Sequence, residues 1–252
     1  MIWDQLTSEE IGQLDKNIPV VLPMAATEQH GTHLPLATDR MIGEHFSTEL
    51  HKVIPDNVLI LPIVAVGCSD HHMDFEGTLT LRHDTFGSQV QDIVRSVIHH
   101  GFRKIVLLNS HGGNQGIGQV LIEQLGDAHP DCHIAMVTWW KIAMDNLLEL
   151  NETGFGGVGH AGEFETSLML LIAPELVRKE KIAPGANTNT FDWAAGDMLR
   201  GPAASYYQTM KEMTPNGTFG DPTNATKEKG ILITQYVIQS LKKIITDFSK
   251  IS

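Results

Sequence analysis

The sequence is poor in cysteine. Cys68 and Cys132 are the only two in 252 residues, and neither belongs to a Cys-x-x-Cys pair. Disulfide frameworks and thiolate zinc sites need more cysteines at closer spacing, so the sequence argues against both. It also lacks an apolar run as long as a membrane span, and its first residues, MIWDQLTSEE, have neither the basic nor the apolar region of a signal peptide. We therefore expect a cytoplasmic protein without a membrane partner.

Positive charge is scarce as well. The chain carries 18 Lys and Arg against 30 Asp and Glu, a formal net charge of −12. An acidic surface repels phosphate backbones, so nucleic acid is not expected as a partner. The sequence also lacks the motifs GxGxxG and GxxxxGK[ST], and carboxylate and imidazole side chains follow its first apolar segment, where a dinucleotide-binding turn needs glycines. These features argue against a nucleotide-dependent dehydrogenase.

What the chain does contain is an alternation of apolar and amphipathic segments. Four segments rich in Val, Ile and Leu predict buried strands: 18–27, 58–67, 103–110 and 132–140. Their apolarity is continuous, which is typical of strands covered on both faces. Helical patterns begin at Asp39, Asp84 and Asn114 and within HAGEFETS, and a last one runs from about 227 to 248. Asp39 and Asp84 can serve as N-caps. We predict a single α/β domain over 1–252 with a mainly parallel sheet.

One long segment does not follow this pattern. Between Pro184 and Thr226 the chain is rich in Gly, Pro, Asn and Thr, without a regular period. Irregular segments of this length are uncommon in compact domains and are usually functional or packed against a partner. Two further residues, His72 and Arg82, flank the stretch FEGTLTL and could contact a substrate, but we expect them to be solvated loop residues.

Polar side chains gather where the predicted strands end. Glu28, His30 and Asp39 follow the first strand, and His111 follows the third. In an open parallel sheet the carboxyl ends of the strands meet at one edge, so we expect these side chains to converge there. Residues two apart in extended chain face the same side, so Glu28 and His30 can reach one site while Gln29 points away.

This set of side chains is typical of a metal site. Mixed oxygen and nitrogen ligands suit zinc, manganese or iron better than calcium or magnesium, and a set without thiolates is unlike structural zinc. Asp39 could bridge two cations through its two oxygens. The alternative is a buried Glu–His hydrogen bond with a capping aspartate. In HAGEFETS, His160, Glu163 and Glu165 cannot all point one way, so we expect one glutamate to be a ligand and the other to support it.

The segments TEQHGTHLPLATD, FEGTLTL, NSHGGN and HAGEFETSLML, in this order, resemble the creatininase family of metal-dependent amidohydrolases. The resemblance extends to about Pro174 and, more weakly, to the last helix. It implies a three-layer α/β/α fold, a homohexamer, and two divalent cations per chain, with zinc preferred over manganese and iron. By position, Glu28 and His111 would hold one cation, His30 the other, and Asp39 both.

The resemblance also implies further roles. His160 matches the family's catalytic histidine. Glu163 matches a glutamate that some members use as the fifth metal ligand, next to the catalytic histidine, whereas other members have a glutamate where Gly113 stands. Around the substrate, we expect an aromatic wall and backbone N–H groups that hold a carbonyl oxygen, from Trp139, Trp140, Gly112 and Gly113.

The function implied is hydrolysis of a non-peptide C–N bond in a small cyclic amide or formamide by water activated between two cations. Gly156 stands where the creatinine-cleaving members carry a tryptophan that closes on the substrate, which argues against creatinine itself. Two alternatives remain open: a hydrolase of another small ring, such as a cyclic ketone, and a metal-binding or small-molecule-binding protein of the same fold without catalysis.

Overall fold

The centre of the protein is a parallel four-stranded sheet. The computed structural model describes residues 1–185, 187–188 and 191–251. Strand order is β2-β1-β3-β4, and all three neighbouring pairs are parallel. The strands are shorter than the apolar segments that contain them: β1 Val20–Met24, β2 Leu59–Ile60, β3 Lys104–Asn109 and β4 His133–Thr138. The carboxyl ends of β1, β3 and β4 therefore point the same way, as expected.

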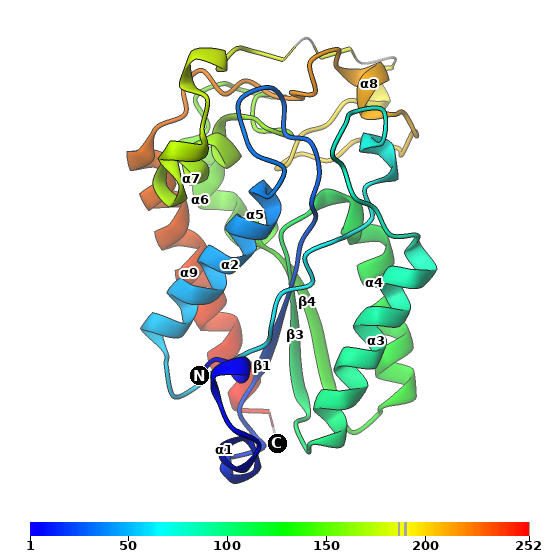
Figure 1. Ribbon diagram of the computed structural model, residues 1–252, viewed down its shortest axis with the longest axis vertical. Helices are drawn as coiled ribbons and strands as arrows, with labels where there is room; N and C mark the ends of the chain where they lie inside the picture. Colours follow the sequence, from blue (N-terminus) through cyan, green and yellow to red (C-terminus); the bar gives the residue numbers. More distant parts are fainter. Residues whose placement is uncertain (186, 189–190, 252) are drawn as a thin grey trace.

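Helices cover both faces of this sheet and make three layers (Figure 1). One layer comprises α3 (His83–His99) and α4 (Gln115–Ala128). The other contains α2 (Thr38–Val53), α5 (Trp139–Ile142), α6 (Met144–Leu150), α7 (Glu163–Ile172) and α9 (Lys227–Ser249). The short helix α1 (Ser8–Gln13) lies near the N-terminus at the opposite end from the carboxyl edge. The predicted α/β/α architecture is confirmed.

Successive strand residues pack against different layers, which explains the continuous apolar runs. Val21 and Val106 lie in a core cluster with the helices of the α2 layer, whereas Leu22 and Leu107 pack in a second cluster with α3 and α4. All of these side chains are fully buried. Alternate side chains of a strand point to opposite faces, so the middle of a strand between two helical layers is apolar at successive positions.

Asp39 and Asp84 do not cap their helices. The N-cap positions of α2 and α3 are Ala37 and Arg82, neither of which makes a side-chain capping bond, and each aspartate lies in the first helical turn. The carboxylate of Asp39 is therefore not held by the N-terminal amides of its own helix and can face the carboxyl edge of the sheet.

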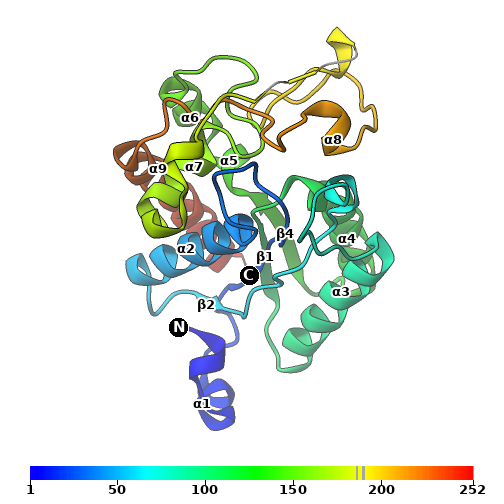
Figure 2. The same ribbon diagram turned by 45° about the horizontal axis from the view of Figure 1, so that its top comes forward.

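The irregular segment packs over that edge (Figure 2). Its described part contains a short 3-10 helix at Asp192–Ala194 and one short α-helix, α8 (Met210–Met213). Backbone hydrogen bonds tie it down, including Gly185 N to Gly220 O and Phe219 N to His160 O, at 2.8 and 2.9 Å. None of the helices in the described residues is long and apolar enough to span a membrane.

Candidate metal centre

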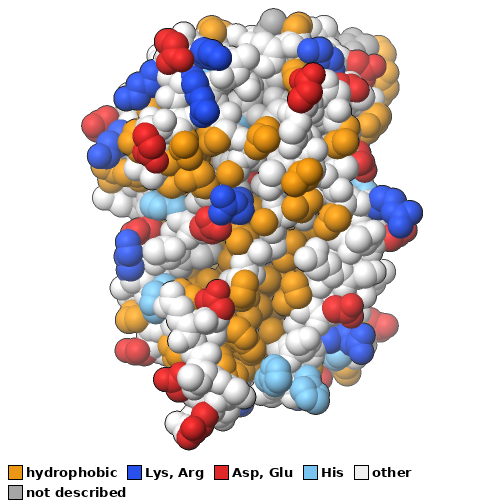
Figure 3. Space-filling view, viewed as in Figure 1, with side chains coloured by type: hydrophobic (Ala, Val, Ile, Leu, Met, Phe, Trp, Pro, Cys, Tyr) orange, Lys and Arg blue, Asp and Glu red, His pale blue; other side chains and the backbone are white. Residues whose placement is uncertain are grey.

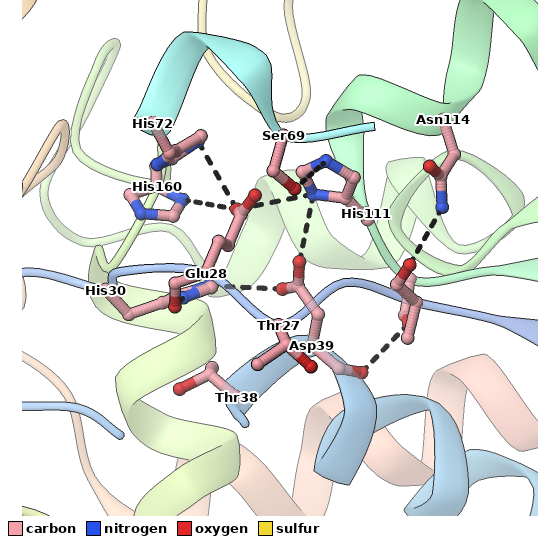
Figure 4. Close-up of polar contacts among 12 residues, drawn as sticks. Thr27, Glu28, His30, Thr38, Asp39, Ser69, His72, His111, Asn114 and His160 are labelled. Atoms are coloured by element: carbon pink, nitrogen blue, oxygen red, sulfur yellow. Dashed lines mark hydrogen bonds and ion pairs between the residues drawn. The ribbon is translucent and has the colours of Figure 1, made fainter. Parts of the chain in front are cut away.

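Buried polar side chains meet at the carboxyl edge of the sheet, as the sequence predicts (Figure 4). The loop after β1 supplies Glu28 and His30, the first turn of α2 supplies Asp39, and the residues after β3 supply His111. All four are at most 3% exposed. The FEGTLTL stretch pairs with the loop that carries Glu28 and His30, because Leu79 N donates to Thr27 O at 2.9 Å.

The carboxylate of Asp39 stands between two imidazoles. Its Oδ1 lies 3.1 Å from His30 Nε2, and its Oδ2 lies 2.9 Å from His111 Nδ1. Glu28 Oε1 is 3.3 Å from the same His111 nitrogen. Three groups of potential ligand atoms result among the described residues, each with all atoms within 4.8 Å of one another. They are Glu28, Asp39 and His111; His30, His160 and Glu165; and Glu28, His72 and His160. A bridging aspartate fits this arrangement.

The structure does not place Glu163 with the other expected ligands. Glu163 is fully buried, but its carboxylate pairs with Lys229 and accepts a hydrogen bond from Thr153 N at 3.0 Å. Glu165 lies in the cluster instead, with Oε2 3.7 Å from His30 Nε2. The reason is helical geometry: Glu163 begins α7, and two residues of an α-helix are rotated by roughly 200°. Of the two glutamates that the sequence left open, Glu165 faces the site and Glu163 supports it from behind.

Backbone carbonyls fix the orientation of three imidazoles. His30 Nδ1 lies 3.1 Å from Glu28 O, His111 Nε2 lies 3.0 Å from Cys68 O, and His160 Nε2 lies 2.7 Å from Gln29 O. A carbonyl only accepts, so each of these nitrogens carries a hydrogen, and the other ring nitrogen is the one that can bind a metal ion. These other nitrogens all face carboxylates: His30 Nε2 and His111 Nδ1 face Asp39, and His160 Nδ1 faces Glu28. Metal-ligating histidines are commonly oriented in this way.

Unpaired buried oxygens are a second indication of a cation. Both carboxylate oxygens of Glu28 and Oδ2 of Asp39 are buried and accept no hydrogen bond of good geometry from the described residues, although imidazole nitrogens lie 2.9 Å from Asp39 Oδ2 and 3.3 Å from Glu28 Oε1. Burial of a carboxylate oxygen without a partner is costly, and a cation would provide one. The donor set therefore fits divalent metal ions.

The close packing of ionisable groups also shifts the pKa values of the histidines and carboxylates. Burial by itself would lower the pKa of His30, but Asp39, Glu165 and Glu28 outweigh it and raise that pKa to about 9. For His160, burial and the nearby His30 prevail and lower the pKa to about 3. Burial raises the pKa of Glu165 to about 7. This is a strongly coupled cluster, as functional sites often are.

Two residues behind the ligands have a larger role than expected. Gln29, expected to point away from the site, is only 5% exposed, and its side-chain nitrogen contacts both His72 and His160. Gln29 Oε1 accepts from Gly31 N at 2.9 Å, and Nε2 lies 2.8 Å from His72 Nδ1. The other nitrogen of His72 therefore carries the hydrogen and lies 3.3 Å from Glu28 Oε1. His72 is 1% exposed and is not a solvated loop residue. Its position before FEGTLTL, which pairs with the Glu28 loop, is the only sequence signal of this role.

A cavity of about 600 Å³ opens above the cluster. Gly112, Gly113 and Trp140 line it, as expected for substrate-contacting residues. Trp139 does not: it is fully buried and packs against Phe46, with ring centroids 5.5 Å apart. Consecutive residues at the start of α5 point in different directions, so only one of the two tryptophans can face the cavity.

Gly113 leaves no room for a side chain. A Cβ atom at this position would collide with the Cys68 carbonyl and the His111 ring. A glutamate, which some family members carry here by resemblance, would not fit this backbone.

The family model described as Creatininase: Creatinine amidohydrolase matches residues 4–245, nearly the whole chain. The chain belongs to the creatininase family.

Among known proteins, the chain is 29% identical to a creatinine amidohydrolase from Pseudomonas putida, over 90% of this chain and 88% of that one. It is 31% identical to a mycofactocin precursor peptide peptidase from Mycobacterium tuberculosis, over 90% and 84%. A 3-dehydro-scyllo-inosose hydrolase from Thermotoga maritima is 23% identical over 90% and 76%. Relatives of this family thus include hydrolases with different substrates.

Solved creatininase structures share the fold. A structure named as the manganese form of creatininase superposes with a TM-score of 0.81 at 27% identity and covers 98% of this chain and 97% of its own. A mutant creatininase described as Zn-Zn type has a TM-score of 0.79 at 27% identity, with the same coverage. The chain is therefore a creatininase-family hydrolase whose structure contains a candidate metal site.

Proposed function

We propose that this chain is a metal-dependent amidohydrolase that cleaves a non-peptide C–N bond in a cyclic amide or formamide. The carboxylate of Asp39, with one oxygen toward each of two imidazoles, carries the proposal. Glu28, Asp39 and His111 would hold one divalent cation, and His30, Asp39 and Glu165 the other. Zinc is the first choice, with manganese or iron as alternatives, because such open sets of oxygen and nitrogen ligands suit these ions.

Two cations in this position would lower the pKa of a shared water toward about 7 and would polarise the carbonyl of the substrate. The protein contributes two groups to this chemistry. His160 faces the cavity floor with its bare Nδ1 3.6 Å from Glu28 Oε1. The N–H groups of Gly112 and Gly113 begin a 3-10 helix, so they have no partner within it and can donate to a carbonyl oxygen.

His160 would transfer the proton. In hydrolysis, the oxygen of water bonds to the carbonyl carbon, the C–N bond breaks, and one proton of the water moves to the departing nitrogen. The bare nitrogen of His160 can take that proton and release it to the leaving group. We expect His160→Ala to lower kcat by about a hundredfold or more while the metal content stays unchanged. Equal turnover of the variant and the parent protein would remove His160 from the mechanism.

The cavity argues against creatinine as the substrate. Gly156, in the loop that leads to His160, has a positive φ of 86°, and its N–H donates to Asp197 Oδ2 at 2.9 Å. No side chain stands there to close on a flat ring. A cavity of about 600 Å³ is also large for so small a molecule.

The volume of the cavity favours a second candidate function, hydrolysis of a short peptide. The mycofactocin precursor peptide peptidases are relatives at 30 to 31% identity, and a short peptide would fill this cavity better than a single small ring. The inosose hydrolase relative supports a ring-ketone substrate, although at lower identity. The complete ligand set with His160 argues against a protein that only binds a metal or small molecule.

Product analysis would decide among these functions. Zinc-loaded protein would be incubated with creatinine, a formamidopyrimidine, simple lactams, a short peptide and a cyclic polyol ketone. Release of amine from a lactam or formamide supports the amidohydrolase. Cleavage of the peptide or ketone alone would replace it with the second candidate or the ketone hydrolase, and no cleavage of any compound would count against catalysis.

We further propose that the chain forms a homohexamer and acts in the cytoplasm on a small molecule. In support of assembly, hydrophobic side chains gather on one face of the molecule, between the two helical layers (Figure 3). Four aromatic side chains of the irregular segment are also at least 42% exposed: Phe191, Trp193, Tyr206 and Tyr207. Light scattering coupled to size exclusion would test the assembly, and a monomer of 27.8 kDa would contradict it.

A further inference from the structure

The cavity above the ligand cluster has two chemically different walls. Its floor consists of the carboxylates and imidazoles already described. Its upper wall is apolar and is built from distant parts of the chain: Trp140, Met144, Leu199, Met213 and Phe219. Most of this wall comes from the irregular segment that covers the edge of the sheet.

Methionine is the commonest apolar side chain in the upper wall. Four of the 10 methionines in the chain line this one cavity: Met144, Met198, Met210 and Met213. Methionine is unbranched and polarisable, so it adapts to the shape of apolar and aromatic groups and makes favourable sulfur–aromatic contacts. A wall of this composition favours a bulky apolar group over a small polar ring.

The apolar wall is held in place by polar contacts behind it. Phe219 N donates to His160 O at 2.9 Å, which fixes this aromatic residue beside the proposed proton-transfer group. Leu199 N donates to Asp197 Oδ1 at 2.9 Å. Helix α8, which carries Met210 and Met213, has a complete capping box at Thr209. The backbone positions of the wall residues are therefore fixed by hydrogen bonds within the folded chain.

Few charged side chains lie in the upper wall of the cavity. Apart from the floor, the charged side chains among the described residues that line the cavity are Lys141 and Asp197. Asp197 accepts hydrogen bonds from the backbone N–H groups of Gly156, Leu199 and Arg200, at 2.7 to 2.9 Å. The carboxylate of Asp197 is thus occupied by backbone hydrogen bonds and is not available to pair with a substrate. Lys141 is exposed, so the interior of the upper wall has no free charge of its own.

We propose that the substrate is an amide with a bulky apolar substituent, such as an aromatic ring or a branched aliphatic chain, which packs against this methionine-rich wall. The proposal rests on the hydrolase function above and specifies its substrate class. The amide would lie on the polar floor and the substituent under Met144 and Met213. Burial of a group of this size improves binding by about tenfold to a hundredfold.

A matched pair of formamides tests this substrate class. N-methylformamide and N-benzylformamide share the scissile C–N bond and differ in the apolar group. Calorimetry would measure the Kd of each for zinc-loaded protein, and formate release would measure hydrolysis. We expect N-benzylformamide to bind at least about tenfold more tightly. Met144→Gln and Met213→Gln, which keep the side-chain length, should each reduce this preference several-fold. Met73→Gln is the control, because Met73 is 52% exposed and does not line the cavity.

The outcomes separate the two proposals. Equal affinity for the two formamides, or an unchanged preference in both methionine variants, would overturn the substrate class. Hydrolysis of both compounds with equal kcat/KM would also overturn it, while supporting the hydrolase function. Tighter binding of N-benzylformamide without formate release would support the apolar wall and count against the hydrolase. Thermal melting of each variant would show that it folds, and either methionine variant alone suffices for the test.

Discussion

Glu163 and Glu165 are two positions apart in α7, and their carboxylates have different surroundings. The first is paired with Lys229, which is only 7% exposed, and the second lies beside His30. The sequence predicts that one of the two is a ligand but not which one, because the choice depends on where α7 begins. Resemblance to the family favoured Glu163. A start at Glu163 turns that side chain toward α9 and Glu165 toward the sheet.

The two glutamates therefore make a matched pair of variants. We expect Glu165→Gln to lower the metal content from about two ions per chain to about one, because a neutral amide is a weaker ligand. We expect Glu163→Gln to keep both ions and to lower the free energy of unfolding by about 3 kcal/mol, because it breaks a buried ion pair. Elemental analysis and urea unfolding measure the two effects. The reverse pattern would return the ligand role to Glu163.

His72 provides a second test at the residue scale. Its hydrogen-bearing nitrogen lies 3.3 Å from Glu28 Oε1, and Gln29 fixes its tautomer. Groups that orient a metal ligand typically contribute about tenfold to a hundredfold in metal affinity. We expect His72→Ala to weaken zinc binding by that factor, as measured by competition with a chelating dye. His129→Ala, at the C-terminal cap of α4, is the control, and equal affinities for the two variants would assign His72 a purely packing role.

The structure of the irregular segment from Pro184 to Thr226 is the part of the fold that was least predictable from the sequence. Its composition predicts that it lacks regular structure and is functional or packed against a partner, and residues of its described part line the cavity. Its path depends on contacts with the loop before α7, such as Asp197 with Gly156 N, which no local pattern indicates. Hydrogen bonds between segments some 40 residues apart become predictable only once both segments are placed by the sheet.

Asp197 is the residue whose loss should loosen this segment. Asp197→Ala removes the acceptor of three backbone hydrogen bonds, each with a net contribution of about 1 kcal/mol. We expect trypsin to cleave after Arg200 at least about tenfold faster than in the parent protein, and KM to rise, because the segment opens locally more often. Asp192→Ala, in the same segment, is the control. Unchanged cleavage would show that Asp197 does not hold the segment.

At the scale of the whole molecule, the cluster of buried carboxylates at the sheet edge should link metal binding to stability. Ions that bind only the folded chain stabilise it by about 4 kcal/mol at a thousand times their Kd. We expect removal of metal by a chelator to lower Tm by about 10 °C in a chain of this size, and added zinc to restore it. Calorimetry measures the shift. An unchanged Tm would indicate that the carboxylates are satisfied without cations.

The sequence by itself determined the layered α/β fold, the parallel sheet and the meeting of Glu28, His30, Asp39 and His111 at its carboxyl edge. It could do so because these features follow from local patterns: continuous apolar strands, helices between them, and polar residues directly after the strands. Tertiary structure alone decided that Glu165 faces the ligand cluster and that His72 lies behind Glu28. It also decided that Trp139 is buried in the hydrophobic core whereas Trp140 lines the cavity. Each of these depends on helix phase or on the approach of distant segments, which a linear pattern does not encode.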